Sequence, residues 1–382
     1  MLCCLLLLPE WIWNAARYST AVMVQTFLLA MLLQSAPAYA ENPVQSIVLR
    51  AREAARSGRF DQAEQDLQAA LKLAETRGAA DEMVLVLGDF GVLLTKTQPE
   101  EAERHLDRAL RIVKSSGHSD DRQLPVILGS LGVLYEQTER YKQSEDFLND
   151  ALQLSKKRLG PDHLYIADLE SNLAVLYMKT GRANKAEKPL ERALALVEKK
   201  LGKDHSYTAP ILTNLAAAYE MRKDRDRAEP LLARAVRLTE ETFGPEHPDL
   251  APMLGNLGLL YYNLGDMARA EPALRRALDL TRKLFGADSI KSALFELSLA
   301  NTLREQGRLD EAHSLYDHAL RIQERDLGPK DSVVAQTLEQ FAKLQRRMSN
   351  PTLAEQMEFR AKFIQSELRR TVRVNRSEQP QR

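Results

Sequence analysis

The sequence has little cysteine, few aromatic residues and no excess of charge of either sign. Both cysteines, Cys3 and Cys4, lie within the first forty of the 382 residues, which excludes a disulfide framework across the rest of the chain. Lysine plus arginine equals aspartate plus glutamate at 53 each, so no overall field draws the chain to nucleic acid or to an anionic membrane. The low aromatic content, 6%, favours helices packed through alanine and leucine over a β-sandwich.

The common enzyme motifs are also missing. The sequence contains no Gly-x-Gly-x-x-Gly, no Gly-x-x-x-x-Gly-Lys-Ser/Thr, no His-Glu-x-x-His and no Gly-x-Ser-x-Gly. We therefore predict no catalytic residues, no cofactor and no metal. An enzyme or small-ligand binder without a recognisable motif remains an alternative.

Small residues recur at a fixed spacing of 42 residues through most of the chain. One column of the repeat is Ala102, Ser144, Ala186, Ala228, Ala270, Ala312 and Ala354. A second is Ala109, Ala151, Ala193, Ala235, Ala277, Ala319 and Ala361. Glycines keep the same period at Gly160, Gly202, Gly244, Gly286 and Gly328. Such a period is typical of a repeat array, in which each repeat buries its apolar face against its neighbours.

Each repeat contains two stretches with helical spacing of apolar residues. In the repeat that ends at Gly202, one stretch has apolar residues at Ile166, Leu169, Leu173, Leu176 and Tyr177, and the other at Ala186, Leu190, Ala193, Leu194, Val197 and Leu201. Charged residues stand between them, so the repeat is predicted to be two amphipathic helices joined by a short turn.

This pattern resembles the tetratricopeptide repeat, and more narrowly the 42-residue repeat of kinesin light chains, here in a bacterial exported form. The resemblance rests on Asn-Leu-Ala/Gly at 172–174, 214–216 and 256–258, on a tyrosine at 135, 177, 219 and 261, and on Leu-Gly-x-Asp/Glu-His at 201–205. It covers most of residues 43–369. It implies an all-α fold, a right-handed α-solenoid of about eight tetratricopeptide helix-turn-helix repeats.

The repeat register predicts the boundaries of the domains. The solenoid is expected over residues 41–369, with repeats near 43–77, 82–116, 124–159, 166–201, 208–243, 250–285, 292–327 and 332–369. Residues 1–40 lie outside the array and are predicted to be an export signal or an anchor. Residues 370–382 are polar without an apolar period, which predicts a disordered tail.

The first forty residues have the features of a secretory leader. An apolar run at 21–33 follows Arg17, and Ala38-Tyr39-Ala40 fits the small-x-small pattern of a signal peptidase site, which predicts cleavage between Ala40 and Glu41. The run of 13 residues is shorter than the roughly 20 needed to span a bilayer. We therefore expect a periplasmic or secreted protein. Membrane anchoring by an uncleaved leader is the alternative, and translation could start at Met1 or at Met23.

The face that the first helices of successive repeats turn inward is the predicted binding surface. Register with the repeat family assigns twelve residues to it, namely Ser171, Val175, Met178, Thr213, Ala217, Glu220, Gly255, Leu259, Tyr262, Leu297, Asn301 and Arg304. Extended surfaces of this kind bind peptides or partner helices. The predicted function is a non-enzymatic scaffold or adaptor with a protein or peptide partner of unknown identity, without nucleic acid and without a membrane unless the leader is retained. A self-assembling structural protein is the alternative.

One histidine per repeat, at His163, His205 and His247, forms a ladder in the loops between repeats. Equivalent atoms of successive repeats should lie roughly 10 Å apart, whereas two nitrogens that share one Zn²⁺ must each lie about 2 Å from it. The ladder also ends at Ser289. We therefore expect these histidines to cap the following helix.

Overall fold

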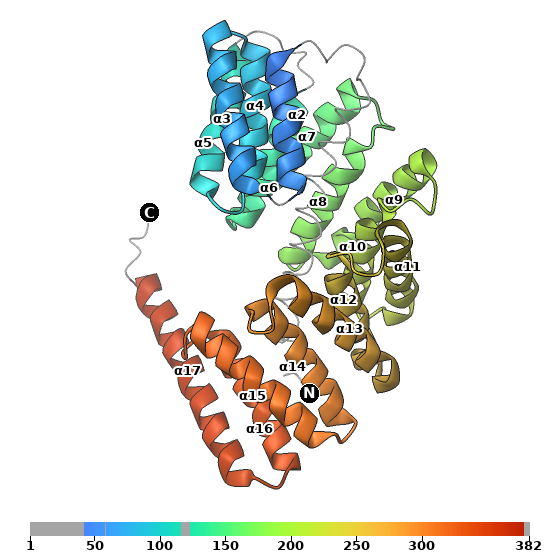
Figure 1. Cartoon of the computed structure of the whole chain (residues 1–382), viewed down its shortest axis with the longest axis vertical. Coiled ribbons are helices and arrows are strands. Elements are labelled where there is room, and N and C mark those ends of the chain that lie inside the picture. Colours follow the sequence, from blue (N-terminus) through green and yellow to red (C-terminus); the bar gives the residue numbers. More distant parts are fainter. Residues whose placement is uncertain (1–41, 58, 116–122, 378–382) are drawn as a thin grey trace. The chain divides into compact units, whose positions relative to one another are not determined.

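The computed structural model describes residues 42–57, 59–115 and 123–377. Within these residues the chain forms sixteen α-helices and one short 3-10 helix, with no β-strand (Figure 1). The all-α fold of repeated helix pairs is therefore confirmed. The predicted leader lies outside the described residues, and inside them no helix combines the length and the apolar character that a membrane span needs.

The chain divides into two compact sections, one ending at Asp224 and the other beginning at Arg225. We call the first helix of each repeat the A helix and the second the B helix, so even-numbered helices are A helices. The first section holds α2 (Pro43–Arg56), α3 (Phe60–Arg77), α4 (Ala80–Leu94), α5 (Pro99–Ser115), α6 (Leu124–Gln137), α7 (Tyr141–Arg158), α8 (Tyr165–Lys179), the 3-10 helix η2 (Ala183–Lys185), α9 (Glu187–Leu201) and α10 (Thr208–Met221).

The second section continues the alternation of A and B helices. It holds α11 (Arg225–Phe243), α12 (Leu250–Leu264), α13 (Met267–Phe285), α14 (Ile290–Glu305), α15 (Leu309–Asp326), α16 (Ser332–Arg347) and α17 (Pro351–Ser377). Within each section a B helix packs between its own A helix and the next one, as α7 does between α6 and α8 and α15 does between α14 and α16. The core is therefore continuous along each section.

A and B helices meet most closely where one carries a small residue and the other a leucine. Ala174 on α8 and Leu190 on α9 are fully buried. Gly132 on α6 lies so close to Leu148 on α7 that an added Cβ would be 2.6 Å from the leucine Cγ, and Gly258 meets Leu274 in the same way. The small residue sets how closely the two helix axes can approach.

The loops between repeats use glycine in a conformation other than the expected one. A glycine that follows a helix commonly adopts the left-handed αL conformation, but Gly202 has φ 94° and ψ 157°. This is an extended backbone with positive φ, which is almost restricted to glycine. Two residues of the histidine ladder bond the residue just before the next helix and not the helix itself. Nδ1 of His205 accepts the backbone N–H of Tyr207 at 3.1 Å, and Nδ1 of His247 accepts that of Asp249 at 3.4 Å.

The last helix differs from the other B helices in length and in polarity. α17 runs to Ser377, past residue 370 where the sequence predicted a disordered tail; no glycine or proline interrupts the chain before Pro380, so the helix can continue. Two residues by which α15 packs against the next A helix are Tyr316 and Leu320. Their counterparts on α17 are Glu358 and Lys362. A polar face at this point ends the array.

Candidate partner-binding surface

The twelve residues predicted to bind a partner, here called the inner wall, lie on α8, α10, α12 and α14. Five of them are buried, namely Val175, Met178, Thr213, Gly255 and Arg304. The other seven are half-buried, namely Ser171, Ala217, Glu220, Leu259, Tyr262, Leu297 and Asn301. The residues on α8 and α10 belong to the first section and those on α12 and α14 to the second, so the inner wall has two parts.

In the first section the inner wall is small and mostly apolar. The Thr213 hydroxyl donates to the carbonyl of Ala209 at 2.9 Å, so its polar atom is satisfied within α10. Met178 is buried, and the next residue, Lys179, forms an ion pair with Glu136 on α6. Thr213 and Lys179 therefore have partners within the protein, whereas the Ser171 hydroxyl has a buried oxygen without a hydrogen-bond partner among the described residues.

An aspartate that the sequence did not single out lies on the same side of α8, one turn before Ser171. Asp168 is half-buried and accepts a hydrogen bond from the hydroxyl of Tyr207, at the start of α10. Among the described residues no cation forms an ion pair with it. Burial raises the pKa of Asp168 to about 7, against the opposing effect of the Tyr207 hydrogen bond. The equivalent positions in the next two repeats are Pro210 and Pro252, so periodicity gave no signal for this group.

In the second section the inner wall carries larger side chains. Gly255 on α12 makes room for the ring of Phe295 on α14, because an added Cβ would lie 2.2 Å from a ring carbon. Leu259, Tyr262 and Leu297 are half-buried, so part of each side chain reaches solvent. This part of the wall therefore offers apolar and aromatic surface that the core does not cover.

Arg304 is the inner-wall residue whose surroundings differ most from the prediction. It was predicted to lie on the binding surface, but it is only 5% exposed. Its Nη1 donates to the hydroxyl of Tyr316 at 3.1 Å and to the carbonyl of Gln340 at 3.3 Å. The Tyr316 hydroxyl in turn donates to Asn301 at 2.5 Å. The network connects α14, α15 and α16. Arg304 therefore stabilises the packing of the inner wall, and its charge is not offered to a partner.

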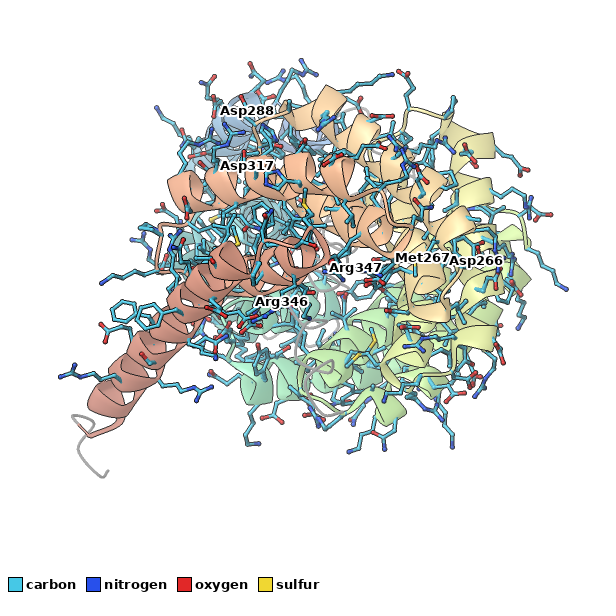
Figure 2. All side chains as sticks on the ribbon, turned by 90° about the horizontal axis from the view of Figure 1, so that it is seen from below. Asp266, Met267, Asp288, Asp317, Arg346 and Arg347 are labelled. Carbon is cyan, nitrogen blue, oxygen red and sulfur yellow. The ribbon has the colours of Figure 1, made fainter. Side chains whose placement is uncertain are left out.

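A second cluster of charged groups lies outside the inner wall. Glu296 on α14 is fully buried and is 2.7 Å from Nη2 of Arg282 and 2.8 Å from Nδ1 of His318. Nε2 of His318 lies 3.0 Å from Asp288, labelled in Figure 2. Because carboxylates only accept hydrogen bonds, the ring can donate to both only as an imidazolium.

The same cluster occurs three repeats earlier, with other cations. Glu170 on α8 is 2% exposed and lies 2.8 Å from Nε of Arg192 and 3.6 Å from Nζ of Lys156. These residues occupy the repeat positions of Glu296, His318 and Arg282. Because the counterpart has no imidazole, the shared feature is a neutralised buried carboxylate, which is a structural arrangement. The described residues include no group of three or more histidine, cysteine or acidic side chains placed to hold a metal.

The comparison with family models matches the tetratricopeptide repeat over residues 123–199, 165–241, 207–283 and 291–361. Together these stretches cover more than half of the chain. No match was found among curated proteins.

Solved structures with the same fold have low sequence identity. BtubC (BKLC) from P. vanneervenii is 23% identical, with a TM-score of 0.51 over 60% of this chain and 92% of its own. A P. anserina protein with nearly identical kinesin light chain TPR-like repeats is 21% identical, with a TM-score of 0.48 over 55% of this chain and 99% of its own. The apo form of the quorum sensor NprR from B. thuringiensis is 13% identical, with a TM-score of 0.65 over 93% of this chain and 97% of its own.

Proposed function

Because the chain belongs to the tetratricopeptide repeat family, with repeats of the kinesin light chain-like type, we propose that it is a non-enzymatic scaffold that binds a protein or peptide along the inner wall. The observation that carries the proposal is the exposure of Leu259, Tyr262 and Leu297. These side chains are only half-buried although their neighbours form a continuous core. Partly exposed apolar and aromatic groups on adjacent helices are what a partner helix or extended peptide would cover.

The two parts of the wall offer different kinds of surface. The small, half-buried residues Ser171 and Ala217 allow close approach of a backbone. Tyr262, which combines an apolar ring with a polar hydroxyl, is of the type enriched among interface hot spots. The quorum sensor NprR has the same fold, which agrees with a recognition role.

Replacing Leu259 and Tyr262 together by glutamate is expected to abolish partner capture, with a loss of about 2 kcal/mol or more of binding free energy for each hot-spot side chain. The measurement compares proteins captured from the native compartment by the wild-type chain and by this variant. A matched control replaces Leu264 and Leu284, which are 39% and 41% exposed and lie outside the wall, by glutamate. Equal capture by all three proteins would place the binding surface elsewhere.

We also propose that the chain is exported and cleaved between Ala40 and Glu41. Helix α2 begins at Pro43 and is capped by Asn42, whose side chain accepts the N–H of Val44 at 3.0 Å; cleavage there would leave the first helix intact. Protein isolated from the periplasm or medium is expected to begin at Glu41 by N-terminal sequencing. An N-terminus at Met1 or Met23 would contradict this.

A further inference from the structure

The outer face of α17 carries two exposed phenylalanines one helical turn apart. Phe359 is 74% exposed and Phe363 is 48% exposed. At the same two positions of the preceding B helix, α15 carries Asp317 (Figure 2) and Arg321, which form an ion pair at 2.9 Å. A water-facing ion pair is thus replaced in the last repeat by an aromatic pair. Exposed aromatic side chains in this arrangement mark an interaction surface.

Charges of opposite sign flank the aromatic pair on the same face. Glu355 precedes Phe359 by one turn and Arg370 follows Phe363 by about two turns, and both are exposed. Neither forms a hydrogen bond or a direct ion pair with another described residue, although Glu355 lies close enough to raise the pKa of Arg346, which is held by Glu358 at 3.0 Å. Glu355, the two phenylalanines and Arg370 follow one another along this face, with the exposed Lys362 beside the phenylalanines.

We propose that this face pairs with the same face of a second copy of the chain, with the two α17 helices antiparallel about a two-fold axis. An order of acidic, aromatic and basic groups is complementary to itself when one helix is reversed. If the two-fold axis crosses α17 at the level of Ala361, Phe359 of each copy meets Phe363 of the other. At 1.5 Å per residue, Arg370 then lies about 4.5 Å along the axis from the level of Glu355 of the other copy, within reach of its long side chain.

Other occupants fit this face less well. An anionic membrane surface or an acidic helix would meet Glu355 as well as Arg370, and like charges in contact oppose binding. An extended peptide needs a groove between elements, whereas these residues lie on one helix. α17 also has 27 residues where α16 has 16, and it continues past its neighbour (Figure 1).

The test is the mass of the purified chain measured by light scattering and sedimentation over a range of concentrations. The wild-type chain is expected to dimerise reversibly. Replacing Phe359 and Phe363 by serine is expected to leave only monomer. Arg370→Glu alone and Glu355→Arg alone should each raise the dissociation constant about 10-fold or more, because each places like charges opposite one another.

Two combinations of these charge variants test the antiparallel pairing of the two α17 helices. The double variant Glu355→Arg with Arg370→Glu should dimerise as the wild type does. An equimolar mixture of the two single variants should form a heterodimer, because each chain then meets the opposite charge. Circular dichroism checks that all variants keep the helical fold. The proposal would be overturned if the wild-type chain stayed monomeric at all concentrations, if the single variants dimerised normally, or if neither combination restored pairing. It would also be overturned if a monomeric chain bound anionic vesicles through the two phenylalanines.

Discussion

Replacing Arg282 by methionine and His318 by leucine together is expected to lower the free energy of unfolding of the second section by about 3 kcal/mol. Glu296 is fully buried, and Arg282 and His318 contact its carboxylate at 2.7 and 2.8 Å. Breaking a buried ion pair from one side strands a charge where water cannot reach it, a loss that typically reaches 3 kcal/mol or more. Arg282 and His318 are themselves about one third exposed, which places the expected loss at the lower end.

Adding Glu296→Leu to this double variant should restore most of the lost stability. Leucine stands at the same repeat position in α10 and α12, as Leu212 and Leu254, and both are buried. The change therefore removes the stranded charge and leaves a side chain that the neighbouring repeats already accommodate. Glu296→Leu alone should have a small effect, because Arg282 and His318 can turn to solvent.

Urea denaturation together with amide hydrogen exchange would measure both effects, since stability in a repeat array is set by each repeat and its neighbours. The loss of protection should be largest in α14 and in the helices that touch it. If the double and triple variants were equally unstable, the loss would come from packing around the side chains of residues 282 and 318 and not from the buried charge.

The fold could be predicted from the sequence because each repeat encodes the same pair of helices. The two columns that contain Ala186 and Ala193 recur in successive repeats, and both residues are fully buried. A single misleading position could not have changed the period. The conformation of Gly202 was less accessible: its positive φ follows from the residue type, but its ψ depends on how the loop enters the next helix.

The buried carboxylates were missed because periodicity assigns an apolar residue to their positions. The sequence does indicate these carboxylates when a position on an A helix is compared with a position on the preceding B helix. Where the A helix carries Glu296, the preceding B helix carries the cation Arg282. Where the A helix carries Leu254, the preceding B helix instead carries Glu240, which forms an ion pair with Arg276 on the next B helix. Comparing substitutions across neighbouring repeats would have indicated the cluster.

The inner wall shows that the repeat register alone does not predict how exposed a side chain is. The register placed Arg304 on the same face as Leu259 and Tyr262, but it gave no account of what surrounds the side chain. Tyr316 stands where α13 carries Leu274, and it brings a hydroxyl into the core. That hydroxyl accepts from Arg304 and donates to Asn301, which draws the arginine inward. A tyrosine at a repeat position that carries leucine in α13 could therefore have indicated that Arg304 is buried.

Asp168→Asn is expected to make the first section more stable than the wild type above neutral pH. Burial raises the pKa of Asp168 to about 7 in the folded chain, whereas an unfolded aspartate titrates near 4. Below pH 4 both states hold the proton and the carboxyl makes no pH-dependent contribution. Between pH 4 and 7 the unfolded state loses its proton first, so stability falls as the pH rises, and above pH 7 the deficit is constant. Because Asp168 is only half-buried, we expect a deficit on the order of 2 kcal/mol.

Asparagine keeps the shape of the neutral carboxyl and can still accept the Tyr207 hydrogen bond, so the variant should lack this pH dependence while the difference from the wild type grows between pH 4 and 7. Unfolding free energies measured in urea at several pH values test this. Tyr207→Phe provides the control: the hydroxyl lowers the pKa of Asp168, so its removal should extend the fall in stability to higher pH. Identical pH profiles for the wild type and Asp168→Asn would mean that water reaches the carboxylate in the folded chain, and that the seam between α8 and α10 is open to solvent at Asp168.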